Sequence, residues 1–316
     1  MNNKHNTISR RQMIGATGSL GASLLCSSLT MANSTDIRMV ARIFFDSYGT
    51  LALRQALRYA GDSGFVASMP QLLHAKTNAT YDNIIWNTYF TANSEENVLK
   101  TPQGNHVVLT IHGTGIFSEP EKIERTLRSD LDRLNDEGLT GQYAAKITQQ
   151  EAKNLLHGRL PDGSEIPIYG FDEFNQGIKK LPMQYGVVLD LGIAKKTYSG
   201  YEEFDTLIDN PVMIIRSGGT ETLSAYLEKA RNRKNTKKMG NFHRYNSIDP
   251  DQPQTRILRL GGSRDGKSSD GSDLGLGRGY DSDWGLSVGF FPGLARYIAV
   301  APRDVATDLQ YLDFEL

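Results

Sequence analysis

The chain has 316 residues, 35 basic and 36 acidic side chains and a formal net charge of −1, which is the composition of an ordinary globular protein. This charge balance lacks the excess of Lys and Arg that nucleic-acid binding requires, so we expect no nucleic-acid partner. A single cysteine, Cys26, excludes a disulfide within the chain.

Residues 1–32 resemble a twin-arginine export signal. The pair Arg10-Arg11 opens a weakly apolar stretch that contains no acidic residue and is too rich in Gly and Ser for a membrane span. Thr30 and Ala32 are the small residues that a signal peptidase needs, so we expect cleavage after Ala32. The alternative is an ordinary Sec signal in which two arginines adjoin by chance.

This resemblance implies that the twin-arginine translocase is a partner during export and that the protein is periplasmic or secreted, with no permanent membrane anchor. Cleavage would remove three basic residues and Cys26, which leaves 32 basic against 36 acidic residues, a net charge near −4, and no thiol. A thiolate metal ligand or a Cys nucleophile is then excluded. The nature of any cofactor stays unknown.

The remaining chain divides into three predicted regions. Residues 33–100 form an N-terminal helical region, in which Ile37, Val40 and Phe44 recur at helical spacing. Residues 101–235 form an α/β core, and residues 236–316 add strands and a long Gly/Asp/Ser loop that pack on the same core.

Strand and helix patterns alternate in the predicted core. Residues 106–112 have the β-branched content of a buried strand, and capping signals at Ser118 and Thr148 begin two helices. Further expected strands are 166–169, 185–191, 212–216, 256–260 and 295–301, and further helices lie near 172–180, 202–208 and 220–233. This order predicts an α/β fold with a mixed or mostly parallel sheet, with α+β as the alternative because two helices follow the first strand.

In a parallel sheet, ligands bind beyond the carboxyl ends of the strands. One candidate there is a turn whose glycines let the backbone approach an anion and whose arginine can bind it with paired hydrogen bonds. This predicted substrate-binding turn consists of Arg216, Ser217, Gly218, Gly219 and Thr220. The alternative is a purely structural turn with Thr220 as a helix cap.

Three residues are candidates for catalysis. His112 ends the first core strand, Asp190 lies near the end of another, and His243 stands in a polar, aromatic loop. A histidine so placed could act as a general acid or base, although a structural role is the alternative for each one.

The segment His112-Gly113-Thr114-Gly115 resembles the oxyanion-hole loop of α/β-hydrolases, in which a His-Gly pair follows a strand. That family also needs a nucleophilic Ser, then an acid, then a His later in the chain. No histidine follows His243, so the order of the triad is not met.

The loop 261–285 carries aspartates among Gly and Ser residues, and Asp265, Asp270 and Asp273 offer the hard oxygen ligands that calcium takes. Their spacing is not that of an EF-hand. A calcium site and a flexible surface loop or lid are both compatible with this composition.

Three functions follow from these patterns. The first is a periplasmic enzyme that acts on a small anionic substrate. The second is a non-catalytic protein that binds a small-molecule, glycan or peptide ligand through the aromatic residues Tyr245, Tyr280, Trp284 and Tyr297. The third is a protein exported with a noncovalent cofactor, since twin-arginine signals carry folded proteins.

Overall fold

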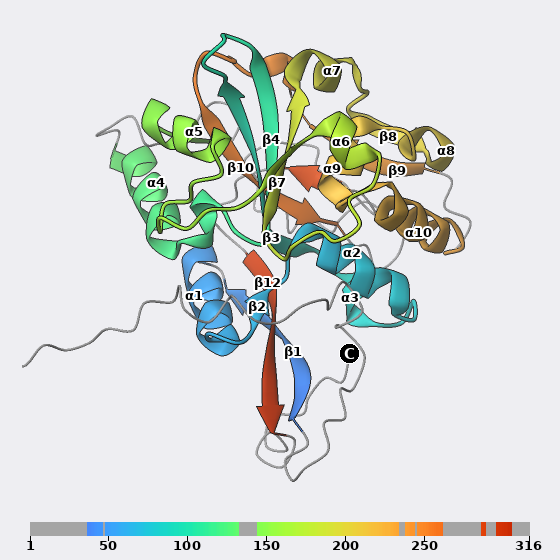
Figure 1. Cartoon of the computed structure of the whole chain (residues 1–316). Coiled ribbons are helices and arrows are strands. Elements are labelled where there is room, and N and C mark those ends of the chain that lie inside the picture. The colour runs from blue at the N-terminus through green and yellow to red at the C-terminus, as the bar shows by residue number, and fades with distance from the viewer. Residues whose placement is uncertain are drawn as a thin grey trace, which may run out of the picture.

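A computed structural model describes residues 37–46, 48–132, 144–233, 238–243, 245–261, 286–288 and 295–304. It combines a large mixed sheet, a small three-stranded sheet and helices on both sides of the large one (Figure 1). No helix within these ranges is long and apolar enough to cross a membrane.

The large sheet has the strand order β6-β7-β4-β3-β10-β11-β9-β8, and β5 pairs with β10 beside this path. Its strands are β3 (Phe90–Lys100), β4 (His106–His112), β5 (Ala145–Lys146), β6 (Ile168–Gly170), β7 (Tyr185–Asp190), β8 (Gly200–Glu203), β9 (Lys238–Phe242), β10 (Gln254–Leu260) and β11 (Leu286–Val288). The strands predicted around residues 106–112, 185–191 and 256–260 are therefore present.

Parallel pairing joins β6 to β7 and β9 to β11, and every other pairing among the described strands is antiparallel. The sheet is mixed, as one predicted alternative had it, but it is not mostly parallel. Neighbouring strands in the chain pair directly: β3 turns into β4 through a tight loop closed by the hydrogen bond from the Thr101 amide to the Asn105 carbonyl. The strands therefore do not all end at one edge of the sheet, as a ligand site beyond their carboxyl ends would require.

The small sheet has the order β1-β12-β2, formed by β1 (Ile37–Asp46), β12 (Ala295–Asp304) and β2 (Phe65–Val66). Strands β1 and β12 pair along their whole length, from Ile37 opposite Asp304 to Asp46 opposite Ala295, and run below the large sheet in Figure 1. The helix predicted over Ile37, Val40 and Phe44 is thus wrong. Its β-branched and aromatic residues favour a strand, but the strand that pairs with it lies near the other end of the chain.

The helices are α1 (Gly49–Ala60), α2 (Met69–Asn78), α3 (Ile84–Asn87), α4 (Pro120–Asp132), α5 (Gln149–Leu156), α6 (Phe171–Asn175), α7 (Leu191–Lys196), α8 (Phe204–Leu207), α9 (Pro211–Ser217) and α10 (Thr220–Arg231). Helix α5 begins with the capping box predicted at Thr148, where the Glu151 amide donates to the Thr148 hydroxyl and the Glu151 carboxylate accepts from the Thr148 amide. The helix predicted after Ser118 is present as α4, which begins at Pro120. Ser118 itself is not its cap: it ends a short 3-10 turn before the helix, and its hydroxyl donates to Asn93 Oδ1.

Helix α9 replaces the strand predicted at residues 212–216. Asn210 caps it through the amides of Val212 and Met213, and Pro211 occupies its first position. All residues from Val212 to Ser217 are buried, so the apolar run is continuous and has no helical period. Such a run does not distinguish a buried helix from a buried strand.

Both faces of the large sheet are covered. One core includes residues of α2, α9 and α10, and the other includes residues of α4 and α5 together with α1, which packs on the small sheet; Figure 1 shows the two groups of helices on opposite sides of the central strands. The central strands β3 and β4 contribute Val98 and Val108 to the first core, and Leu99 and Leu109 to the second. A polar side chain on these strands must therefore find its partners inside the protein.

Candidate functional site

Two consecutive glutamates lie in the middle of β3 and were not predicted as site residues. Glu95 and Glu96 are 2% and 0% exposed, and as neighbours in a strand they point to opposite faces of the sheet. A search for hydrophobic strands does not find β3, because the residues around the two glutamates are polar. Polar residues are rarely buried on both faces of a central strand.

Glu96 is the centre of a buried ion cluster, in which Arg216 binds it with two hydrogen bonds. Arg216 Nε donates to Glu96 Oε1 at 2.6 Å, and Nη2 donates to Oε2 at 3.1 Å. Arg256 lies opposite Glu96 on β10, with Nη2 3.6 Å from Oε2. All three side chains are at most 2% exposed. The cluster therefore ties α9 to two strands of the sheet.

The remaining donors of Arg216 are also used by the protein. Its Nη1 donates to Asn241 Oδ1 at 2.9 Å and to the Phe242 carbonyl at 3.1 Å. Burial by itself raises the pKa of Glu96, but the charges of Arg216 and Arg256 and the hydrogen bonds from Arg216 outweigh it and hold the pKa below its ordinary value. Arg216 thus connects parts of the protein interior, and its guanidinium is shielded from solvent.

His112 joins the same region through a defined chain of hydrogen bonds. The Met69 amide donates to Ser94 Oγ at 2.9 Å, Ser94 Oγ lies 2.9 Å from His112 Nδ1, and His112 Nε2 lies 2.8 Å from the Ile215 carbonyl. Because a carbonyl only accepts, Nε2 carries the proton and Nδ1 accepts from the Ser94 hydroxyl. Burial lowers the pKa of His112 to about 4, so the ring is neutral at pH 7.

His243 is held in a similar way, at 3% exposure. The Thr197 hydroxyl donates to the Ala194 carbonyl, so it accepts from His243 Nε2 at 2.8 Å. Burial and the positive charge of Arg216 lower the pKa of His243 to about 4. Its Nδ1 is buried and makes no hydrogen bond to the described residues.

The predicted substrate-binding turn joins two helices. Gly218 has a φ of 81° and ends α9, and Gly219 precedes α10, which begins at Thr220. The Thr220 hydroxyl donates to Asn175 Oδ1, and Ser217 is fully buried. The turn therefore connects α9 to α10, without a strand leading into it.

Asp190 lies apart from these groups. It pairs with Val107 at one end of the β4–β7 ladder, whereas His112 pairs with Tyr185 at the other end. The Asp190 carboxylate accepts from the Ile193 amide and caps α7. The structure therefore brings His112, His243 and the Arg216 turn together and leaves Asp190 at the far end of the strands.

The loop that resembles an oxyanion hole lies against the carboxylate of Glu95, which is bound by donors outside this loop. The Phe117 amide donates to Glu95 Oε2 at 3.0 Å, and Asn97 Nδ2 donates to Glu95 Oε1 at 3.1 Å. A side chain at Gly115 would overlap the Glu95 carboxylate. Burial raises the pKa of Glu95 even though these donors lower it. The space next to Gly115 is thus filled by a carboxylate of the protein itself, which leaves no room for a substrate oxyanion beside that glycine.

The other predicted contacts divide into buried residues and residues that the structure does not describe. Tyr245 and Tyr297 are 0% and 2% exposed and belong to the core. Tyr280, Trp284 and the calcium candidates Asp265, Asp270 and Asp273 lie outside the described residues. Within the described ranges, no group of three or more His, Asp or Glu side chains is placed to hold a metal ion.

Among known proteins, the comparison found a similar solved structure but no similar family or curated protein. No protein-family model and no curated protein matches the sequence. The chain is similar to a solved structure described as "Accommodation of massive sequence variation in Nanoarchaeota by the C-type lectin fold", with 25% identity and a TM-score of 0.57 over 84% of this chain and 99% of the other. The chain has a C-type lectin-like fold.

Proposed function

We propose that this chain is an exported, non-catalytic protein that binds a glycan or peptide ligand on a C-type lectin-like scaffold. The observation that carries this proposal is the fold likeness, which spans 99% of the solved chain. A match over nearly a whole chain means that the shared part is the scaffold itself and not a local motif. Fold alone does not determine a ligand, so the ligand has to be found by measurement.

The state of the candidate catalytic residues supports binding over catalysis. His112, His243 and Arg216 are buried, and each is hydrogen-bonded to other parts of the chain, His243 through Nε2 alone of its two ring nitrogens among the described contacts. Both histidines have a pKa of about 4, which is far from the value near 7 that suits a general base at neutral pH. The cluster therefore fits a structural role better than proton transfer.

The description of the similar solved structure links the C-type lectin fold with massive sequence variation. We extend that link to this chain: a core fixed by an internal ion cluster leaves surface positions free to change. Variation at exposed positions then alters the ligand with little effect on folding, because surface substitutions away from special features change stability by only about 0.5 kcal/mol.

Export through the twin-arginine pathway remains part of the proposal and rests on residues 1–32 alone. Replacing Arg10 and Arg11 by Lys should abolish transport of the full-length chain, with the mature form measured in a periplasmic fraction. Transport that persists in the Lys variant would assign the signal to the Sec pathway instead.

Calcium binding is proposed on the chemistry of Asp265, Asp270 and Asp273. If calcium binds the folded state, a melting curve of the mature chain should shift upward with added calcium and downward with a chelator. Equal melting temperatures in both solutions would remove calcium from the proposal.

The binding function itself is tested by applying the mature chain to glycan and peptide arrays and then titrating the best ligand by calorimetry. We expect saturable binding, with the ligand recovered unchanged by mass spectrometry. A chemically altered ligand would show an enzyme, and the absence of any glycan or peptide ligand would reject the proposal.

A further inference from the structure

Four side chains form an alternating stack of aromatic rings and arginines between the two sheets. The Arg296 guanidinium carbon lies 4.8 Å from the ring centre of Phe45 and 4.9 Å from that of Tyr89. The Arg259 guanidinium carbon lies 4.6 Å from the same Tyr89 ring. We call these four residues the arginine–aromatic ladder. They come from β1, β12, β10 and the residue just before β3.

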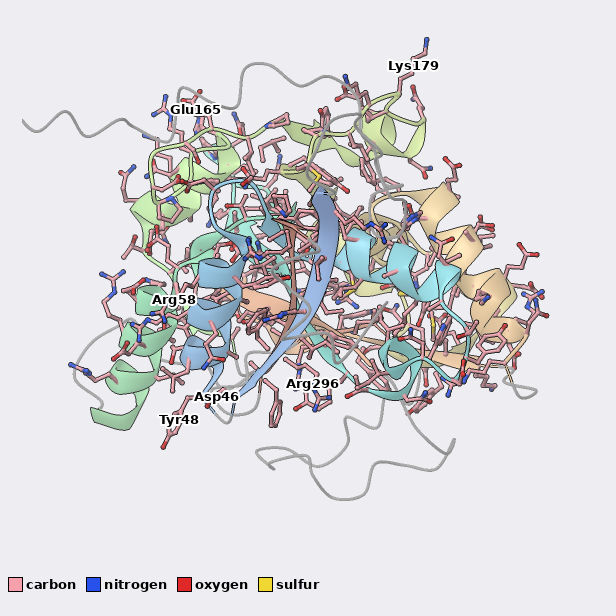
Figure 2. All side chains as sticks on the ribbon, turned by 90° about the horizontal axis from the view of Figure 1, so that it is seen from below. Asp46, Tyr48, Arg58, Glu165, Lys179 and Arg296 are labelled. Carbon is pink, nitrogen blue, oxygen red and sulfur yellow. The ribbon has the colours of Figure 1, made fainter. Side chains whose placement is uncertain are left out.

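The ladder is set by the strand register. Phe45 and Arg296 face each other directly across the β1–β12 pair, so their side chains leave the sheet on the same face. Asp46 pairs with Ala295 and points to the other face, and its Oδ1 accepts from the Tyr48 amide. Figure 2 shows Arg296 and Asp46 close together when the molecule is viewed from below.

Arg296 differs from the buried arginines because nothing within the described part of the chain engages its guanidinium by a hydrogen bond or an ion pair. Its guanidinium lies over the two rings, and the side chain as a whole is only partly buried. Partial burial lowers the pKa of Arg296 while the charge stays in place. No carboxylate among the described residues thus offsets the loss of hydration that partial burial imposes on this cation.

A guanidinium fixed between two rings is already ordered for binding an oxyanion. Its N–H groups lie in one plane and match two oxygens of a carboxylate or sulfate, and the stacking removes the rotational freedom that binding would otherwise cost. Phe45 is 50% exposed, so an apolar ring surface adjoins this charged edge. A sugar that carries an acidic group presents both a C–H face and an oxyanion.

We propose that the arginine–aromatic ladder binds an anionic glycan, with Arg296 holding a carboxylate or sulfate of the sugar and the exposed part of Phe45 packing against a sugar ring. This inference rests on the proposed binding function and names its ligand class. A peptide with acidic side chains offers the oxyanion without a rigid C–H face to cover Phe45, so it fits the ladder less completely.

The experiment measures binding of the full mature chain to two anionic probes, oligogalacturonate and dextran sulfate. Methyl-esterified oligogalacturonate and unmodified dextran are the uncharged counterparts, and polyglutamate is the peptide probe. We expect binding to at least one anionic glycan, weakening as salt rises, and none to its uncharged counterpart. The preferred probe distinguishes a carboxylate from a sulfate.

Two variants test the residues. Arg296→Gln should lower the affinity by at least about tenfold, because a charge-assisted pair of hydrogen bonds is lost. Phe45→Ala should weaken binding less, since the charge remains. Arg303→Gln is the matched control: Arg303 also lies on β12, but it stacks 4.3 Å from the Tyr59 ring and donates to the Tyr59 carbonyl. Melting curves establish that each variant is folded.

Four results would overturn the inference: no binding of either anionic glycan, equal binding by the Arg296→Gln variant, equal binding of the uncharged counterparts, or tighter binding of polyglutamate. If the arrays yield a neutral glycan or a peptide that binds independently of Arg296, the inference fails and the proposed function stands. If the chain binds nothing at all, both fail.

Discussion

Arg216 and Arg296 use the same side chain in opposite ways. Arg216 is 0% exposed, bound to Glu96 by two hydrogen bonds and satisfied by Asn241 and Phe242. Arg296 is partly exposed and stacked between two rings, and no carboxylate of the described residues is paired with it. The comparison teaches that a charge already satisfied inside the protein stabilises the fold, whereas a preorganised charge without a partner is available for a ligand.

The largest effect should come from breaking the buried cluster. Arg216→Ala leaves Glu96 ionised and buried next to one remaining arginine, which should reduce the free energy of unfolding by about 3 to 5 kcal/mol. Urea unfolding measures this loss, and soluble yield reports it if the variant does not fold. The matched control is Arg296→Gln. Equal stability of the two variants would contradict the contrast between the sites.

The effect of pH on stability through a single buried histidine should come next in size. His112 and His243 have folded-state pKa values of about 4, below the value of about 6.5 in an unfolded chain. Their contribution is complete above pH 6.5 and is lost as the pH falls toward 4, because only the unfolded chain takes up protons in this window. Between pH 7 and pH 4, protonation of the unfolded chain at each histidine should reduce the free energy of unfolding by about 3 kcal/mol.

The His112→Gln variant separates this effect from that of Glu95, whose raised pKa acts in the opposite direction. Urea unfolding between pH 7 and pH 4 should give a shallower fall in stability for this variant than for the wild type. His157→Gln is the control, because the exposed His157 ring binds only the Lys153 carbonyl at a helix end. Parallel curves for wild type and His112→Gln would show that His112 does not titrate as described.

A third variant tests whether the turn after Arg216 serves folding. Gly218 has a φ of 81°, and a side chain there would meet Pro70 Cγ at 2.6 Å, so Gly218→Ala should cost roughly 2 to 3 kcal/mol from strain and overlap together. Gly104→Ala is the control, since Gly104 has a φ of 88° but open space around it, and should cost only about 1 kcal/mol. Equal melting temperatures for the two variants would reject the close contact with Pro70.

The smallest effect on stability should come from the ladder. Arg296→Gln should reduce the free energy of unfolding by about 1 kcal/mol, because it loses the contacts with the two rings but no ion pair within the described chain. Urea unfolding at pH 7 measures it. A loss as large as that of Arg216→Ala would place Arg296 among the structural arginines.

Local signals in the sequence predicted local structure well. The capping box at Thr148 and the β-branched run at residues 106–112 correctly predicted α5 and β4, because each depends on neighbours in the chain. The predictions failed where the environment decides. Helix α9 is buried on all sides, and β1 needs a strand from a distant part of the chain.

The candidate site was predictable only in part. Sequence reasoning selected His112 and Arg216, and the structure places them near each other, since His112 binds the Ile215 carbonyl next to Arg216. It missed Glu96, because its neighbours read as a polar stretch and its partners lie on β10 and α9. Nor could spacing reveal the ladder, whose members come from four separate parts of the chain.

The pairing of β1 with β12 has a consequence for how the protein is made. Strand β1 leaves the ribosome well before its partner, because residues 295–304 lie far along the chain. The small sheet therefore closes only after β12 has been synthesised, and a chain cut short before residue 295 lacks it. Such a chain exposes the edge of β1 that β12 covers in the complete fold, which distinguishes it from the folded protein.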